Sequence, residues 1–268
     1  MDRKTNPGSL LRTERLSKNF GGIQAVQNLD FEIEKGEIVA IIGPNGSGKT
    51  TFFNLIMNLY AASSGKILFG DPPVDLTQRP THEINGLGIA RTFQTLRLFP
   101  NLTVLENVLV GMTARQKTGF FGALFRPPAV RLEEQEAEER SLEVLSFFGQ
   151  RLISMCNEPA RNLSYANRRR LEIARALASE PKLMLLDEPA AGMNPSETRE
   201  VMEDIKRING RGYTVLLIEH DMSLVEGLAR RVVAFDHGAK IAEGTFKEVC
   251  RDPEVISAYL GRKYAASA

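Results

Sequence analysis

The apolar residues in the first part of this chain form two patterns that predict different strands. Within about residues 11–68 strands are separated by turns, and residues 30–34 alternate polar and apolar, as in a strand with one solvated face. We expect residues 35–36 to close a hairpin. Residues 37–42 are instead almost continuously apolar, which is typical of a strand buried on both faces. This part of the chain predicts mixed α/β structure.

A helical stretch then interrupts the strand pattern between about residues 100 and 162. Residues 105–112 and 131–148 have helical spacing, with acids and bases of the second segment arranged as on a surface helix. A bend rich in glycine and aromatic residues is expected at 117–122, followed by Pro127 and Pro128. The sequence therefore predicts a helical subdomain inserted into an α/β fold.

Strands and helices alternate again from Ser164 to the end of the chain. The predicted strands are 183–186, 214–218 and 232–235, and the predicted helices are 168–178, 195–208 and 223–229. Strands separated by helices imply parallel crossovers and a sheet covered on both faces. The expected fold class is α/β, with a mostly parallel sheet and an antiparallel region near the N-terminus.

A glycine-rich loop lies between the buried strand at 37–42 and a predicted helix. It matches the pattern G-x-x-x-x-G-K-[ST] in full, and its candidate nucleotide-binding residues are Gly43, Pro44, Asn45, Gly46, Ser47, Gly48, Lys49, Thr50 and Thr51. The apolar residues that recur at helical spacing after it are Phe52, Phe53, Leu55, Ile56 and Leu59. Backbone N–H groups and a helix dipole would meet there on the phosphates of a nucleotide. Lys49 is expected to reach the β and γ phosphates, and Thr50 to hold Mg²⁺.

Polar side chains follow three further apolar strands. Asp187 and Glu188 come after one strand, His220 follows the next, and Gln94 follows a third. Ligands of open α/β sheets bind at the carboxyl ends of the strands, so these residues are candidates for one site. We expect Asp187 to hold the magnesium shell through a water and Glu188 to orient or deprotonate a water that attacks the γ phosphate. His220 is expected to hydrogen-bond the γ phosphate, and Gln94 to contact Mg²⁺ or water.

Composition limits the partners of the protein. The chain has 268 residues, 43% hydrophobic and 25% charged, which is enough for a core in one or two domains. Its net charge is +1 without long blocks of one sign, so no nucleic-acid partner is expected. Its apolar runs are far shorter than the roughly 20 residues that span a bilayer, and no signal region follows the first residues. We expect a cytoplasmic chain that reaches a membrane only through a partner. Cys156 and Cys250 are interpreted as reduced structural thiols rather than metal ligands.

Together these motifs resemble the nucleotide-binding subunit of an ATP-binding-cassette (ABC) transporter, over nearly the whole chain. The residues at the place of the family's signature are Leu163, Ser164, Tyr165, Ala166 and Asn167. The resemblance implies a single ABC ATPase domain over 1–268, with an ATP-binding core at about 8–98 and 163–262 and a helical subdomain at about 99–162. It also implies that Phe20 stacks on adenine and that Gln94 is a sensor at the domain junction.

The resemblance further implies how the protein works. ATP with Mg²⁺ would be hydrolysed to move a solute through separate integral membrane permease subunits. Two ATPase subunits, identical or different, would face head to tail and enclose each ATP between one phosphate loop and the other subunit's signature. The chain would be peripheral on the inner face of the cell membrane, and a periplasmic solute-binding protein would deliver the solute.

Several segments are similar to importer subunits for branched-chain amino acids, namely 91–100, 102–108, 119–127, 169–176, 187–195 and 255–261. Importers of urea, amides and aromatic acids share these features, so the solute stays open. A non-transport cassette ATPase is one alternative, although such proteins usually carry two cassettes or long insertions. A stand-alone P-loop kinase or GTPase is another, but it would not explain the signature stretch.

The signature departs from the family pattern at Ala166, where Gly is usual, and at Asn167, where Gln is usual. In the head-to-tail dimer the glycine backbone approaches the γ phosphate, so the Cβ of Ala166 is expected to crowd that approach or to shift the preferred backbone angles. We therefore expect the composite site that uses this signature to hydrolyse ATP more weakly than the site at this chain's phosphate loop. Asn194 stands where many relatives carry Asp, although the branched-chain subgroup commonly has Asn.

Two further groups of residues have ordinary interpretations. Arg168, Arg169 and Arg170 are interpreted as a solvated helix face rather than a phosphate site. The aromatic residues Phe120, Phe121 and Phe125 are interpreted as core of the helical insertion, with a docking surface for a membrane subunit as the alternative.

Overall fold

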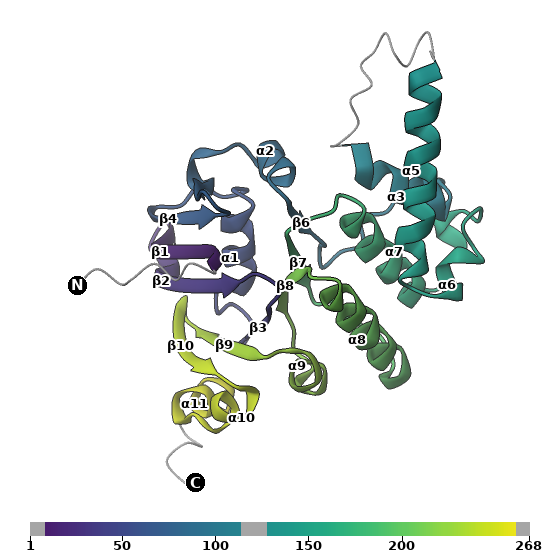
Figure 1. The fold of residues 1–268 in the computed structure, drawn as a ribbon. Helices are drawn as coiled ribbons and strands as arrows, with labels where there is room; N and C mark the ends of the chain where they lie inside the picture. The colour runs from purple at the N-terminus through teal and green to yellow at the C-terminus, as the bar shows by residue number, and fades with distance from the viewer. Residues whose placement is uncertain (1–8, 114–127, 261–268) are drawn as a thin grey trace.

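The computed structural model describes residues 9–113 and 128–260 (Figure 1). The strands of these residues form two sheets, a four-stranded antiparallel sheet in the order β2-β1-β4-β5 and a six-stranded sheet in the order β10-β9-β3-β8-β7-β6. In the larger sheet β3, β6, β7, β8 and β9 are parallel, and β10 runs antiparallel to β9. The expected α/β class, with an antiparallel N-terminal region, is confirmed.

The elements have the following bounds. The strands are β1 (Ser9–Phe20), β2 (Ile23–Glu34), β3 (Ile38–Ile42), β4 (Ser64–Phe69), β5 (Val74–Asp75), β6 (Ile89–Arg91), β7 (Leu183–Asp187), β8 (Thr214–Ile218), β9 (Arg231–Asp236) and β10 (Ala239–Gly244). The described helices are α1 (Lys49–Ile56), α2 (Thr81–Gly86), α3 (Val104–Met112), α5 (Pro128–Ser146), α6 (Gln150–Ile153), α7 (Tyr165–Leu177), α8 (Pro195–Gly210), α9 (Met222–Leu228), α10 (Phe246–Arg251) and α11 (Pro253–Leu260).

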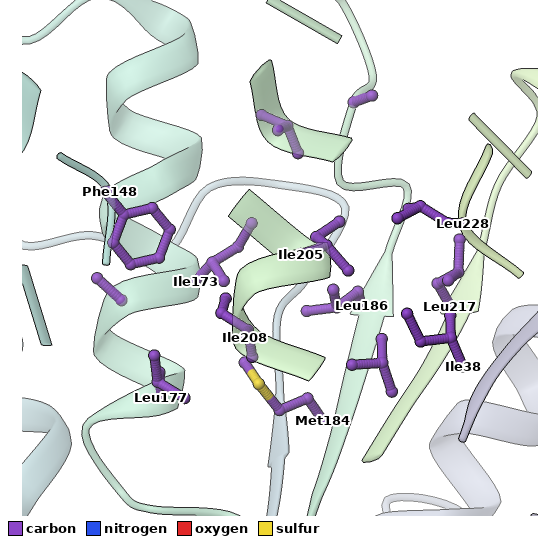
Figure 2. Packing of buried hydrophobic residues seen from close by; sticks show 14 of the residues in the cluster. Ile38, Phe148, Ile173, Leu177, Met184, Leu186, Ile205, Ile208, Leu217 and Leu228 are labelled. Atoms are coloured by element: carbon purple, nitrogen blue, oxygen red, sulfur yellow. The ribbon is translucent and has the colours of Figure 1, made fainter. Parts of the chain in front are cut away.

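The central strands β3, β7 and β8 are buried at every position, as their continuous apolar sequences predict. Alternate residues of β3 enter two different hydrophobic clusters. Ile38 and Ala40 belong to a cluster with residues of α7 and α8, whereas Val39 and Ile41 belong to one with α1 and the antiparallel sheet. Figure 2 shows the first cluster, in which side chains of α8 lie between α7 and β7. The sheet is thus fixed from both faces, which holds the ends of its strands in place.

The helical stretch lies on the opposite side of β6 and β7 from the antiparallel sheet (Figure 1). The expected helices at 105–112 and 131–148 are present as α3 and α5, although α5 begins three residues earlier, at Pro128. Helix α3 packs against α5 and α7. The predicted bend at 117–122 and the residues Phe120, Phe121 and Phe125 lie outside the described residues.

The expected hairpin at residues 35–36 is wrong. Strand β2 pairs with β1 across a turn at Gly21 and Gly22, and β3 belongs to the other sheet. The alternating pattern of residues 30–34 identifies a strand with one solvated face, but it does not say which strand is the partner. Leu59 also lies beyond the end of α1, which ends at Ile56.

Among the described residues no helix combines the length and apolar character needed to cross a membrane. Cys156 and Cys250 are free thiols, as expected.

Candidate functional site

The phosphate loop connects the end of β3 to the start of α1. Gly43, Gly46 and Gly48 have φ angles of 146°, 81° and 103°, a region that favours glycine. A Cβ at Gly43 would lie 2.2 Å from the carbonyl oxygen of Phe235, and one at Gly48 would lie 2.3 Å from that of Ala25. Glycine is required at these two positions because both the backbone angle and the space exclude a side chain. The loop therefore passes closely between β2 and β9 into α1, where free N–H groups can meet an anion.

Lys49 places its ammonium group inside the curve of this loop. Its Nζ donates to the main-chain oxygens of Gly43 at 2.8 Å and Pro44 at 2.9 Å, and to Ser47 Oγ at 3.4 Å. Burial lowers the pKa of Lys49, whereas Glu188 and Asp187 raise it. A positive charge is thus held beside the glycine-rich backbone, where it would attract phosphate.

Asp187 ends β7 and forms a buried ion pair that the sequence analysis did not anticipate. Its Oδ2 accepts from Arg91 Nη2 at 3.0 Å, and both side chains are 3% exposed. Burial raises the pKa of Asp187, and the hydrogen bond from Arg91 lowers it. Arg91 also donates to Asn54 Oδ1 of α1 at 2.6 Å. The sequence feature that could have indicated this ion pair is the position of Arg91 at the end of β6, the strand beside β7.

Glu188 brings together the three catalytic candidates of the sequence. It has a φ of 49°, an uncommon left-handed conformation directly after β7. Its Oε1 lies 3.0 Å from His220 Nε2, and its Oε2 accepts from Gln94 Nε2 at 3.1 Å. These side chains come from segments far apart in sequence and meet on one carboxylate at the carboxyl edge of the sheet.

Glu219 is a second carboxylate at this edge, and the sequence analysis missed it. It is 3% exposed. Its Oε1 accepts from Ala190 N at 2.9 Å, and its Oε2 accepts from His220 N at 2.8 Å and Asp221 N at 3.3 Å. Burial raises the pKa of Glu219, and these N–H donors lower it. In the sequence, Glu219 could have been recognised as an acid that lies directly between the apolar strand β8 and His220. Glu219 ties the loop after β7 to the loop after β8.

Phe20 lies at the end of β1, on the antiparallel sheet, and is 42% exposed. Its ring contacts Tyr60 edge to face, with centroids 5.2 Å apart, and Lys18 Nζ lies 4.8 Å from its centroid. Exposed aromatic faces can stack on a nucleobase. Tyr60, also exposed, was not among the predicted site residues.

The signature segment forms the start of α7. Ser164 is the N-cap residue and accepts from Asn167 N at 3.3 Å, while Leu163 is buried and Tyr165 is exposed. Ala166 is only 3% exposed, so its methyl group is enclosed within its own chain. This burial gives no support to the expected crowding of a partner's phosphate by that Cβ. The weaker composite site stays a prediction.

The interpretation of the arginines after the signature as a solvated face is wrong for two of them. Arg169 is 0% exposed and Arg170 is 2% exposed. Each is compensated by buried carboxylates: Glu172 accepts from Arg169 at 2.8 Å, and Asp204 accepts from Arg170 at 2.9 Å. Sequence alone places arginine in water because it does not show such partners.

Asn194, the other departure from the family pattern, is the N-cap residue of α8. Its Oδ1 accepts from Ser196 N at 2.9 Å and from Glu197 N at 3.0 Å, in a capping box. Asn and Asp are about equally good at this position, so the substitution leaves the cap intact.

Oxygen donors suited to Mg²⁺ are available at the same edge. Thr50 is exposed at the start of α1, Gln94 follows β6, and Asp187 is the last residue of β7. The described residues contain no group of three or more His, Cys, Asp or Glu that could hold a metal alone. Mg²⁺ at phosphate sites uses one or two carboxylates together with phosphate oxygens, so this donor set fits it.

A glycine-rich loop between a buried strand and a helix, with an enclosed lysine and two strand-end carboxylates, defines a P-loop nucleotide-binding protein. The family model described as ABC transporter matches residues 26–191. A second model, described as branched-chain amino acid ATP-binding cassette transporter, matches residues 239–265. The chain belongs to the ABC transporter family.

Individual relatives agree with this assignment. The chain is 44% identical over 253 residues to the high-affinity branched-chain amino acid transport ATP-binding protein LivG of Escherichia coli K12, covering 94% of this chain and 98% of LivG. Among solved structures it is similar to the ADP conformation of the cassette MJ1267, with TM-score 0.81, 33% identity and coverage of 95% and 99%. The dimeric cassette MJ0796 is similar with TM-score 0.73, 26% identity and coverage of 88% and 98%.

Proposed function

We propose that this chain is the ATP-hydrolysing subunit of an ABC importer for branched-chain amino acids or related small solutes. The observation that carries the proposal is the meeting of Gln94 and His220 on Glu188, beside a phosphate loop that encloses Lys49. The family supports ATP as the nucleotide. The 44% identity to LivG, named as a branched-chain amino acid transport protein, supports the solute class.

Each side chain has a distinct part in the proposed hydrolysis. The loop N–H groups and Lys49 would bind the phosphates, while Phe20 would stack on the adenine. Thr50 and Gln94 would hold Mg²⁺, with Asp187 acting through a water. When bound, Mg²⁺ neutralises charge on the β and γ phosphates.

Glu188 would then orient the attacking water and accept its proton. Its carboxylate is already aimed by His220 and Gln94, which hydrogen-bond to its two different oxygens. His220 would also hydrogen-bond the γ phosphate as hydrolysis proceeds. Arg91 orients Asp187 through their buried ion pair, and its hydrogen bond opposes the larger effect of burial, which raises the pKa of that carboxyl group.

The working assembly in this proposal contains further subunits. Two ATPase subunits, identical or different, would form a head-to-tail dimer in which the segment 163–167 faces the partner's ATP. The similarity to a dimeric cassette supports such an arrangement. Integral membrane permeases would carry the solute, this chain would be peripheral on the inner face of the membrane, and a periplasmic protein would deliver the solute.

The proposal is tested by uptake into proteoliposomes that contain this chain with the permeases and ATPase encoded beside it. Labelled leucine is offered with the adjacent solute-binding protein, and urea, an amide and an aromatic acid are offered in parallel. Wild type is expected to take up leucine only with MgATP, and Glu188→Gln to stop uptake. Glu203→Gln, an exposed acid on α8, is the matched control and should transport normally.

Each result decides between the alternatives. Uptake of only urea, an amide or an aromatic acid would keep the importer but change the solute. ATP hydrolysis without any transport would favour a non-transport cassette ATPase. Unchanged uptake in Glu188→Gln would contradict the assigned role of Glu188.

A further inference from the structure

Two buried charged residues of α7 hold the main chain of the loop that carries Gln94. Arg169 donates from Nη1 to the main-chain oxygen of Phe93 at 2.6 Å and from Nη2 to that of Gln94 at 2.9 Å. Glu172 Oε1 accepts from the main-chain N–H groups of Phe93 at 3.4 Å and Arg97 at 3.3 Å. These are the hydrogen bonds described for the main chain of residues 93–97, so α7 shapes this loop.

The loop and the ion pair depend on each other. Arg169 and Glu172 are 0% and 1% exposed and lie 2.8 Å apart, from Nη1 to Oε2. Buried charges persist where an opposite charge and further hydrogen bonds replace their lost water. The main chain around Gln94 supplies those further bonds. Moving the loop away from α7 would leave both charges short of partners, so the loop and the helix are held as one body.

The same helix begins in the signature. Ser164 caps α7 and Tyr165 is its first residue, so Arg169 lies about one turn inside the helix. At the other end of the loop, the Gln94 side chain donates to Glu188. A continuous series of contacts thus runs from Glu188 through Gln94 and Arg169 to the segment 163–167.

We propose that Arg169 and Glu172 are positioning residues that make the Gln94 loop and the signature helix one rigid unit, so that a nucleotide contacting Gln94 displaces residues 163–167 with it. The inference rests on the proposed function, since it assigns a consequence to ATP at Gln94. It links a residue of the chain's own site to the segment that faces the partner's ATP.

Arg170 shows that an arginine of α7 can be buried without bonding to the main chain of the Gln94 loop. It is 2% exposed, donates to Asp204 and Glu200 of α8 and to Asn167 Oδ1 of the signature, and no contact between it and residues 93–97 is described. Arg170→Met therefore removes a comparable buried ion pair from the same helix and leaves the Gln94 loop attached. It is the matched control for loss of stability.

The test measures hydrogen exchange of the full chain with and without the Mg²⁺ complex of the nonhydrolysable analogue AMP-PNP, at a concentration where light scattering shows a monomer. The variants are Arg169→Met, Arg170→Met and the double variant Arg169→Met/Glu172→Gln, which removes both charges of the ion pair. In wild type and Arg170→Met the analogue is expected to slow exchange at residues 43–51, 92–98 and 164–170. In the double variant the change at 164–170 should be lost while that at 43–51 persists.

The outcomes separate this inference from the proposed function. A preserved response at 164–170 in the double variant overturns the coupling and leaves ATP binding intact. No response at 43–51 in any variant contradicts ATP binding, and the inference with it. In the reconstituted transporter the double variant should lower kcat for ATP about tenfold or more, with KM changed less than about twofold, because the phosphate loop is untouched. A larger change in KM than in kcat would contradict a positioning role.

Discussion

At the edge of the central sheet the site residues are placed by strand ends, whereas at the signature they are placed by buried arginines. Glu188 and His220 follow β7 and β8, whose residues are buried at every position. The start of α7 is held by Arg169 and Arg170, which bond carboxylates and main-chain groups of other segments. Substitution of a reacting group should therefore leave the fold at the sheet edge intact, whereas at α7 stability and coupling depend on the same side chains.

The largest expected effect is the loss of ATPase activity in Glu188→Gln, with little change in the free energy of unfolding. Glu188→Gln keeps the shape and an acceptor for Gln94 but removes the proposed base, so the ATPase rate should fall about 10³-fold or more. The free energy of unfolding should change by less than about 0.5 kcal/mol, because no core contact is lost. Steady-state ATPase assays and urea unfolding measure the two quantities. A similar loss of rate and of stability would remove the distinction between the two regions.

The opposite result is expected on α7. Arg170→Met leaves the buried Asp204 without its main partner, which should lower the free energy of unfolding by about 3 kcal/mol. Arg140→Met removes an exposed arginine, 61% accessible and 3.9 Å from Glu180, and should cost less than about 0.5 kcal/mol. Urea unfolding compares the two variants. Equal midpoints would show that the buried pair does not hold the helix.

The phosphate loop combines positive φ angles with close backbone contacts, and two of its glycines separate these two constraints. Gly48→Ala places a Cβ against the carbonyl oxygen of Ala25 at a positive φ, and we expect a loss of about 2 to 3 kcal/mol. Gly46 also has a positive φ, but nothing lies within 4 Å of its Cβ position. Gly46→Ala should therefore cost only about 1 kcal/mol. Thermal unfolding distinguishes the contribution of space from that of backbone angle.

The smallest effect concerns the signature itself. Ala166 is buried in the first turn of α7, where alanine favours the helix over glycine. Ala166→Gly should lower the free energy of unfolding by about 0.5 to 1 kcal/mol. If the methyl group crowds the partner's phosphate, the same variant would raise the ATPase rate of the dimer. An unchanged rate with lower stability would show that this position serves the helix alone.

The site residues at the sheet edge could be predicted because the sequence features that identify them lie within single short segments. The phosphate loop is contiguous, and the apolar runs before Asp187 and His220 identify buried parallel strands without knowledge of their neighbours. The partner of β2 was mispredicted because alternation at residues 30–34 specifies a face but not a pairing. Sheet order depends on contacts between distant segments.

The arginines of α7 could not be predicted for a related reason. Asp204, which compensates Arg170, is 34 residues away in the chain. Glu172 lies one helical turn from Arg169, but the main-chain groups that complete its environment are 75 and 79 residues away. An arginine is expected in water unless such partners are known, so its burial follows from the tertiary structure alone.

Glu219 separates the three residues that meet at Glu188 into a pair with a shared anchor and a third residue anchored elsewhere. Its single carboxylate accepts N–H groups from the loops after β7 and β8, so Glu188 and His220 share one anchor on the sheet. Gln94 reaches Glu188 from a loop anchored on α7. If α7 moves as proposed, the contact expected to open is the one between Gln94 and Glu188. Loss of that one amide contact would leave Glu188 and His220 aligned with each other, because Glu219 ties their two loops together.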